Sequence, residues 1–194
     1  MVIIIDCGSV SVPDIVREVR RFRSKMMMVG LQEFEADQMP DHDALIISGT
    51  NMNFTDGEFE ALREKFAFLM TSDMPTLGIG GGMQIIGQSY RAQIYKGVCE
   101  RDYTTMTRHT DHAILSHFSY QFDMKTNHCE GITLPAGFQK VASSRNYEVE
   151  AIAHHFRPIY GVMFNPELSG TLGTAIFKNF FNLANSYIQN PMLR

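Results

Sequence analysis

The sequence predicts an α/β fold of three layers, in which helices cover both faces of a mostly parallel central sheet. The first half of the chain alternates continuous apolar runs with segments of helical spacing, a pattern typical of parallel strands buried on both faces. The second half holds short strand-like runs without helices between them, which indicates added antiparallel strands. At 194 residues, the chain is expected to form one domain over residues 1–194.

The elements of the first half are expected in strict alternation. Apolar runs of strand length cover 2–6, 26–29, 44–49 and 76–79. Between them, apolar residues recur at the spacing of one helix face over 11–25, 55–70 and 82–90. Ser11 is expected to cap the first helix, and Thr55 with Glu58 has the spacing of a capping box at the start of the second.

The elements of the second half are expected to be short strands and hairpins, followed by one long helix. The candidate strands lie near 103–108, 113–116, 120–124, 138–143, 149–154 and 160–163. The chain closes with an amphipathic segment over 170–189, whose large apolar residues recur at helical spacing and predict a packed helix.

Composition and charge narrow the function classes. The net charge of -4 does not favour a basic groove for nucleic acid, and we expect the local basic run to form the solvated face of one helix: Arg17, Arg20, Arg21, Arg23 and Lys25. No segment approaches the roughly 20 apolar residues of a membrane span. The first residues lack the basic leader of a signal peptide, so a cytoplasmic protein is expected.

The cysteines are expected to be reduced thiols. Cys7, Cys99 and Cys129 are odd in number, widely spaced and without a CxxC pair. No metal and no cofactor are expected. The histidines at 109, 112, 117, 154 and 155 lack a third ligand at a helical spacing, which makes each group a weak metal signal.

A glycine turn is the clearest functional signal. In "TLGIGGGMQIIGQ" (76–88), an apolar strand runs through three consecutive glycines into a helix. Such a turn directs free backbone N–H groups at the positive end of the helix dipole, where an anion binds. With Ser or Cys at its tip the turn would be a nucleophile elbow. A dinucleotide fingerprint is disfavoured, because its third glycine position falls on Met83.

A second signal is the Asn-Pro-Glu stretch over 165–167. A buried strand ends at Phe164, and the proline holds Asn165 in extended geometry. The side chains of Asn165 and Glu167 are therefore expected to project from the same strand end. If that end lies beside the glycine turn, the two residues form a polar dyad.

Together these stretches resemble the class I glutamine amidotransferases, and within them most of all the stand-alone glutaminase subunits of GMP synthase. The resemblance covers nearly the whole chain and is carried by "VIIIDCG" (2–8), "ALIISGT" (44–50), "PTLGIGGGMQIIGQ" (75–88), "NHCE" (127–130), "VEAI" (149–152) and "RPIYGVMFNPE" (157–167). It implies a flavodoxin-like fold. It also implies glutamine hydrolysis, in which a Cys attacks the amide, a His transfers protons and a Glu orients the His, with ammonia passing to a synthetase partner.

The resemblance implies that two catalytic residues are missing. Gly80 stands where the Cys belongs and Asn165 where the His belongs, while Glu167 is retained. Loss of the nucleophile in a covalent mechanism costs on the order of a millionfold in turnover, and Asn is no base near neutral pH. The resemblance also implies an oxyanion or ligand-binding set made of Gly49, Thr50, Gly81, Gly82, Gln84 and His128.

Three functions are therefore expected as alternatives. The first is a degenerate relative without catalysis, which binds glutamine or an anion, or regulates a synthetase (ATP-pyrophosphatase) subunit of purine biosynthesis. The second is an active amidotransferase that supplies ammonia to a synthetase, in which either an unforeseen residue, such as one of the cysteines, replaces the missing nucleophile, or the catalytic residues were replaced deliberately. The third is a scaffold that uses the fold for protein interaction only.

Overall fold

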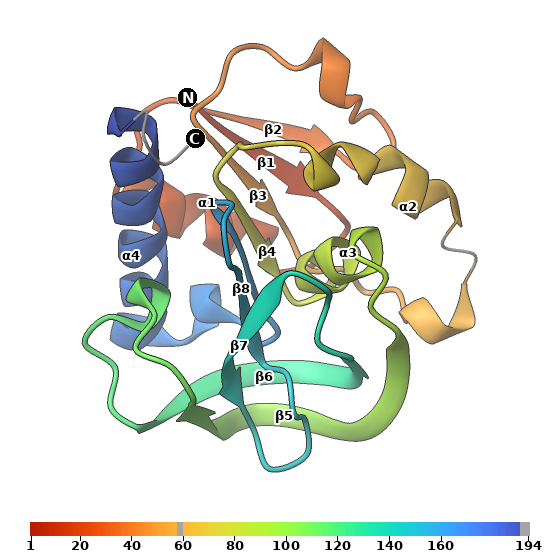
Figure 1. Cartoon of the computed structure of the whole chain (residues 1–194), viewed down its shortest axis with the longest axis vertical. Coiled ribbons are helices and arrows are strands. Elements are labelled where there is room, and N and C mark those ends of the chain that lie inside the picture. Colours follow the sequence, from red (N-terminus) through yellow and green to blue (C-terminus); the bar gives the residue numbers. More distant parts are fainter. Residues whose placement is uncertain (58–59, 191–194) are drawn as a thin grey trace.

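The computed structural model describes residues 1–57 and 60–190, and its strands form one sheet (Figure 1). The strand order is β2-β1-β3-β4-β9-β8-β7-β5-β6. The first five strands in this order pair in parallel: β2 (Met26–Gly30), β1 (Val2–Asp6), β3 (Ala44–Ile47), β4 (Thr76–Ile79) and β9 (Ile159–Val162). The others pair antiparallel: β8 (Ala151–His154), β7 (Phe138–Ser143), β5 (Ile94–Arg108) and β6 (Gln121–Ile132).

Helices cover both faces of the parallel strands, so the expected flavodoxin-like arrangement of three layers is confirmed (Figure 1). Helices α1 (Val12–Arg20) and α4 (Gly170–Gln189) pack in one apolar core with Ile4 of β1. Helix α3 (Gly81–Ser89) packs in the other core with Ile3 and Ile5, on the same side as α2 (Glu60–Lys65). Successive residues of β1 thus face opposite layers, as the period of a strand requires.

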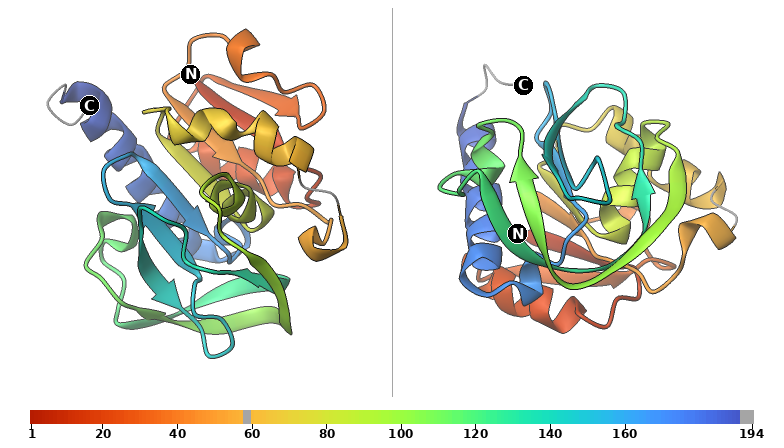
Figure 2. Two further views of the ribbon diagram at one scale, coloured as in Figure 1. Left: turned by 45° about the vertical axis from the view of Figure 1, so that its right-hand side comes forward. Right: turned by 90° about the horizontal axis from the view of Figure 1, so that it is seen from below.

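The two longest strands form a curved ribbon at one end of the molecule (Figure 2). Strand β5 has 15 residues and pairs with the 12 residues of β6, with an irregularity between Lys96 and Glu100. Because the ribbon bends past the end of the parallel strands, it brings residues of β6 close to the turn that follows β4.

The helix expected over 55–70 is broken. Helix α2 is preceded by a 3-10 turn at Phe54–Asp56 and followed by another at Ala67–Met70. The hydroxyl and the backbone N–H of Thr55 both donate to the Glu130 carboxylate on β6, so this residue belongs to a separate turn held by the ribbon. Its expected capping partner, Glu58, lies outside the described residues. The first helix is also shorter than expected, since α1 ends at Arg20.

The strand expected over 113–116 is a 3-10 turn at Ala113–Leu115. The side chains of Ile114 and Leu115 are buried in the core beside α4, and the Asn179 amide of α4 donates to the carbonyl of Ile114. A short apolar run is compatible with either conformation, and packing against the helix selects the turn.

The cysteine prediction is wrong for two of the three residues. Cys99 of β5 and Cys129 of β6 form a disulfide across the ribbon, although they are 30 residues apart in sequence. Antiparallel pairing of β5 and β6 places the two cysteines opposite each other, and their spacing in the sequence does not predict this pairing. Cys7 is a free, buried thiol.

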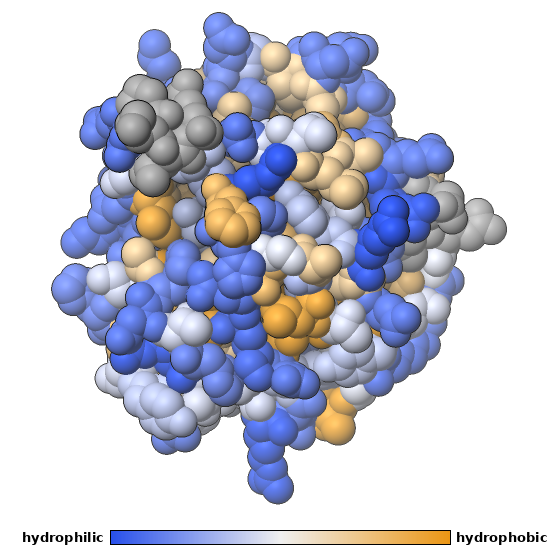
Figure 3. Space-filling model, in the orientation of Figure 1, coloured by the Kyte–Doolittle hydropathy of each residue, from blue (hydrophilic) through white to orange (hydrophobic). Residues whose placement is uncertain are grey.

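The surface seen in Figure 3 is mostly hydrophilic, with apolar residues in small separate areas. None of the described helices has both the length and the apolar character that crossing a membrane requires.

Candidate functional site

A cavity of about 270 Å³ lies beyond the carboxyl ends of β3 and β4, and we call it the front cavity. Most of the residues expected to form a site line it: Gly49, Thr50, Gly80, Gly81, Gln84, His128 and Asn165. Gly82 and Glu167 are buried behind this lining. Chain segments that are distant in sequence therefore converge at the edge of the sheet where parallel α/β folds place their ligands.

The glycine turn has the backbone conformation of an elbow. Gly80 has φ 53° and ψ -115°, and its N–H donates to the Val162 carbonyl of β9 at 2.7 Å. Helix α3 begins at the next residue. A Cβ built on Gly80 would lie 3.7 Å or more from its neighbours, so position 80 has room for a side chain that faces the cavity.

The other two glycines of the turn are required by close packing. A Cβ on Gly82 would overlap the carbonyl oxygen of Ile47 in β3, and a Cβ on Gly81 would overlap the Thr50 side chain. These contacts press the start of α3 against the end of β3. They explain why three glycines follow one another, whereas the elbow alone needs only one.

The turn keeps donors for a negatively charged or carbonyl oxygen. Among the described residues, neither the Gly49 N–H nor the Gly81 N–H has a hydrogen-bond acceptor, and both residues line the front cavity. The amino-terminal end of α3 carries the positive end of the helix dipole to the same place.

Asn165 and Glu167 form the expected dyad. The amide nitrogen of Asn165 donates to Oε1 of Glu167 at 3.0 Å. The Ser11 hydroxyl donates to the same oxygen at 2.6 Å, and the hydroxyl oxygens of Ser9 and Ser11 lie 2.9 Å apart. Ser11 does occupy the cap position of α1, but it makes no side-chain cap, because its hydroxyl is bound to the carboxylate. Burial raises the pKa of Glu167 against the lowering effect of Ser11 and Asn165.

Replacing Glu167 by Gln is expected to make the protein more stable at neutral pH. With its raised pKa, the folded protein binds the Glu167 proton more tightly than the unfolded chain, where the pKa is near 4.5. The contribution of Glu167 to the free energy of unfolding of the wild type therefore falls as the pH rises from the unfolded-state pKa through the folded-state pKa of Glu167. Each unit of pKa difference corresponds to about 1.4 kcal/mol.

The measurement is urea unfolding of both proteins between about pH 4 and pH 8, since linkage makes the difference in unfolding free energy grow over this window. The exposed Glu64, changed to Gln, is the control and should follow the wild-type profile. Parallel profiles for wild type and Glu167→Gln would contradict the raised pKa.

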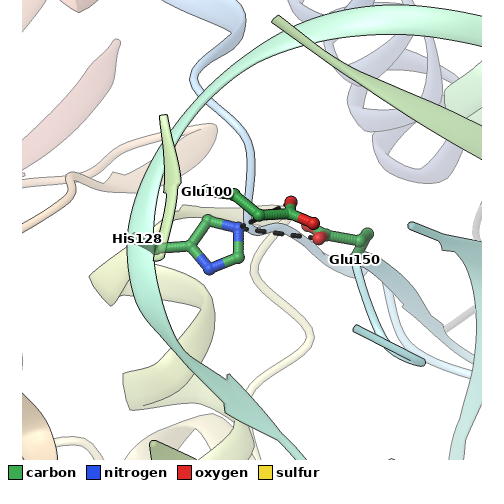
Figure 4. Close-up of side chains that lie close together, drawn as sticks. All are labelled: Glu100, His128 and Glu150. Carbon is green, nitrogen blue, oxygen red and sulfur yellow. Dashed lines mark ion pairs between the residues drawn. The ribbon is translucent and has the colours of Figure 1, made fainter. Parts of the chain in front are cut away.

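His128 lines the front cavity, and its two ring nitrogens face different groups. Nδ1 lies 3.0 Å from the Glu130 carbonyl, while Nε2 faces Glu150 at 3.5 Å and Glu100 at 3.9 Å (Figure 4). Burial lowers the pKa of His128, but Glu150, the Glu130 carbonyl and Glu100 together raise it above the ordinary value. Burial raises the pKa of Glu150 despite His128.

Gln84 has a bridging role. Its amide donates to the Glu130 carboxylate at 3.2 Å, and that carboxylate also accepts the N–H groups of Phe54 and Thr55. Gln84 and Glu130 therefore join α3, the ribbon and the turn at 54–56 around the cavity.

Several residues of the site were missed from the sequence. Ser9, Arg101, Asn127 and Glu130 line the front cavity. Asn127 and Glu130 had a signal, as the first and last residues of "NHCE" (127–130), whereas Ser9 and Arg101 had none. Of the scattered histidines, His109 pairs with Ser143, and the ring of His154 accepts the N–H of Phe156. The described residues contain another group of three possible ligands, Glu100, His128 and Glu150.

Comparison with known proteins shows the family of this chain. The family model for class I glutamine amidotransferases matches residues 3–184. A glutamine-hydrolysing GMP synthase subunit of Thermoplasma volcanium is 30% identical over 158 residues, covering 80% of this chain and 78% of the relative. The corresponding protein of Methanococcus aeolicus is 28% identical over 185 residues, covering 93% and 95%. A Thermoplasma acidophilum crystal structure, described as that of a GMP synthase subunit, has a TM-score of 0.88 at 26% identity, covering 97% of this chain and 95% of its own.

Proposed function

This chain belongs to the class I glutamine amidotransferase family, and from that premise we propose that it binds a small ligand in the front cavity without hydrolysing glutamine. It is similar to the glutaminase subunits of GMP synthase. The observation that carries the proposal is Gly80, which has the backbone geometry of a nucleophile elbow but no side chain to attack with.

No other thiol is placed to replace the nucleophile. Cys7 is the one free cysteine of the chain, all three cysteines being described. Burial raises the pKa of Cys7 to about 12, so its reactive thiolate is scarce at neutral pH. Cys99 and Cys129 are joined in a disulfide.

Position 165, where the family resemblance places the proton-transferring His, holds an Asn. The Asn165 amide occupies the place beside Glu167 where the family resemblance puts a His, and it makes the hydrogen bond to the carboxylate. An amide neither accepts nor returns a proton near neutral pH. Glu167 therefore has nothing catalytic to orient, and the active-amidotransferase alternative lacks both a nucleophile and a base.

The ligand that fits the remaining groups is glutamine, or an anion such as a carboxylate or phosphate. The N–H groups of Gly49 and Gly81 suit a carbonyl or anionic oxygen, and the start of α3 adds a positive dipole end. The absence of a side chain at Gly80 widens the cavity at this point.

We further propose that the single domain of residues 1–194 acts in the cytoplasm as a binding or regulatory subunit for a synthetase of the ATP-pyrophosphatase type, in purine biosynthesis. The similarity of this chain to subunits of GMP synthase supports the synthetase partner. A protein that senses glutamine without consuming it would report substrate supply to such a partner.

The test joins an ammonia-release assay to calorimetric titration with glutamine. The wild type is expected to bind glutamine and release no ammonia above the blank. Gly80→Leu should abolish binding, since the new side chain enters the front cavity. Gly170→Leu is the matched control, because Gly170 has a similar φ of 60°, no atom within 4 Å of a built Cβ, and a place outside the cavity lining.

Two outcomes would overturn the proposal. Ammonia release by the wild type would show an active amidotransferase. Absence of heat with glutamine, glutamate and phosphate alike would leave the scaffold as the remaining function.

A further inference from the structure

Three ligand-type side chains converge in the interior beside the ribbon (Figure 4). Glu100 comes from β5, His128 from β6 and Glu150 from the residue before β8. One ligand atom from each lies within 4.8 Å of the other two. Their side chains are 4%, 9% and 0% exposed, respectively. Two carboxylates at such depth need either a proton or a compensating positive charge.

The protonation of His128 follows from its contacts. Nδ1 lies 3.0 Å from a backbone carbonyl, which can only accept, so Nδ1 carries a proton and donates it to Glu130. Nε2 then faces Glu100 and Glu150 either as a lone pair or with a second proton. A lone pair facing two carboxylates is repelled unless a cation or a carboxyl proton lies between them.

The spacing favours a metal ion over a proton at Nε2. A charged hydrogen bond from the ring to a carboxylate would be about 2.7–2.9 Å long, whereas the observed distances are 3.5 and 3.9 Å. Ligand bonds of about 2.0–2.2 Å in a tetrahedron place neighbouring ligand atoms about 3.4 Å apart. Nε2, Oε2 of Glu100 and both carboxylate oxygens of Glu150 have no hydrogen-bond partner among the described residues.

The surroundings hold the three ligands in place. The Ser144 hydroxyl and the Asn146 amide donate to Oε1 of Glu100, at 3.1 and 2.9 Å, which leaves Oε2 for the centre of the cluster. The Tyr147 ring lies 4.7 Å from the His128 ring and is itself anchored by its hydroxyl to the Val98 carbonyl. Metal-ligating histidines typically donate their other ring N–H to a carbonyl, and metal-ligating carboxylates typically accept hydrogen bonds from neighbouring donors. His128 and Glu100 each have such outer partners.

We propose that Glu100, His128 and Glu150 bind one divalent transition-metal ion. One nitrogen and two carboxylate oxygens suit Zn²⁺, and the two negative charges neutralise it. His128 also lines the front cavity, which provides a route for the ion and for a water as fourth ligand. The site is separate from Gly80 and Asn165, so the proposal does not rest on the proposed function.

The experiment is a Zn²⁺ titration of the chelator-treated, full-length protein in the absence of glutamine. One equivalent of Zn²⁺ is expected to bind and to raise the melting temperature. Glu150→Gln and His128→Gln should each weaken binding by at least about 100-fold, and Asn146→Ala by about 10-fold, as outer-partner losses do. The matched control is His155→Gln, an exposed histidine whose loss should leave affinity unchanged.

X-ray absorption at the zinc edge gives a second measurement that is independent of variants. The first shell is expected to hold nitrogen and oxygen at about 2.0–2.2 Å and no sulfur. Sulfur in that shell would assign the ion to the cysteines and overturn the proposal. Wild-type affinity in a folded Glu150→Gln protein, or loss of binding in His155→Gln alone, would show adventitious surface binding and overturn it as well.

Discussion

The Gly80→Cys, Asn165→His double variant is expected to release ammonia from glutamine at a rate at least about 1000-fold above the detection limit that bounds the wild-type rate, a partial recovery of the millionfold that a covalent catalytic set provides. Gly80 already has the elbow conformation, and a Cβ there meets nothing closer than 3.7 Å. The Asn165 nitrogen, 3.0 Å from Glu167, marks where an imidazole could donate to the same carboxylate. The positive φ at position 80 costs a Cys on the order of 1–3 kcal/mol, which the fold can absorb.

The single variants are the controls for this result. Gly80→Cys alone lacks a base and Asn165→His alone lacks a nucleophile, so neither should exceed the wild type by more than a small factor. Adding Glu167→Gln to the double variant should lower the gain, because the His loses the carboxylate that orients it. A double variant that binds glutamine but releases no ammonia would contradict the expectation and show that the reacting groups no longer meet.

Gly82→Ala is expected to destabilise the protein by about 3 kcal/mol or more, at the upper end of overpacking substitutions. The new methyl group would overlap the Ile47 carbonyl oxygen and lie 2.7 Å from its carbon. These are backbone atoms of the central strand β3, which has strands paired on both sides and cannot move aside. Urea unfolding measures the loss.

Gly49→Ala is the matched control for Gly82→Ala. It adds the same methyl group at the end of β3, but the nearest atoms would be 3.6 Å away, an ordinary contact. Its unfolding free energy should stay close to that of the wild type. Equal losses in the two variants would contradict the close-packing explanation of the glycine run.

The elements with strong local patterns were predicted within a residue or two. Strands β1 and β4 and helix α4 have the bounds expected from their apolar patterns, because burial on both sheet faces or along one helix stripe marks the sequence directly. The turn at Ala113–Leu115 and the break before α2 were missed. In both places the conformation depends on a residue far along the chain, Asn179 in one and Glu130 in the other.

The front cavity could be predicted in large part, since its glycine turn and its Asn-Pro-Glu stretch are local patterns at strand ends. Ser11 shows the limit of that reasoning. Its place before α1 suggested a cap, yet its hydroxyl binds a carboxylate 156 residues away. The disulfide between Cys99 and Cys129 likewise depends on the pairing of two strands.

The sequence by itself determined the alternation of strands and helices along the first half of the chain, the glycines of the elbow, and the presence of Gly80 and Asn165 where the family resemblance places a nucleophile and a base. These are properties of residue type and local periodicity, which need no knowledge of distant contacts. Only the tertiary structure decided which side chains meet behind the cavity. Glu100, His128 and Glu150 come from three separate segments, and the bend of the β5–β6 ribbon brings them within reach of a single ion.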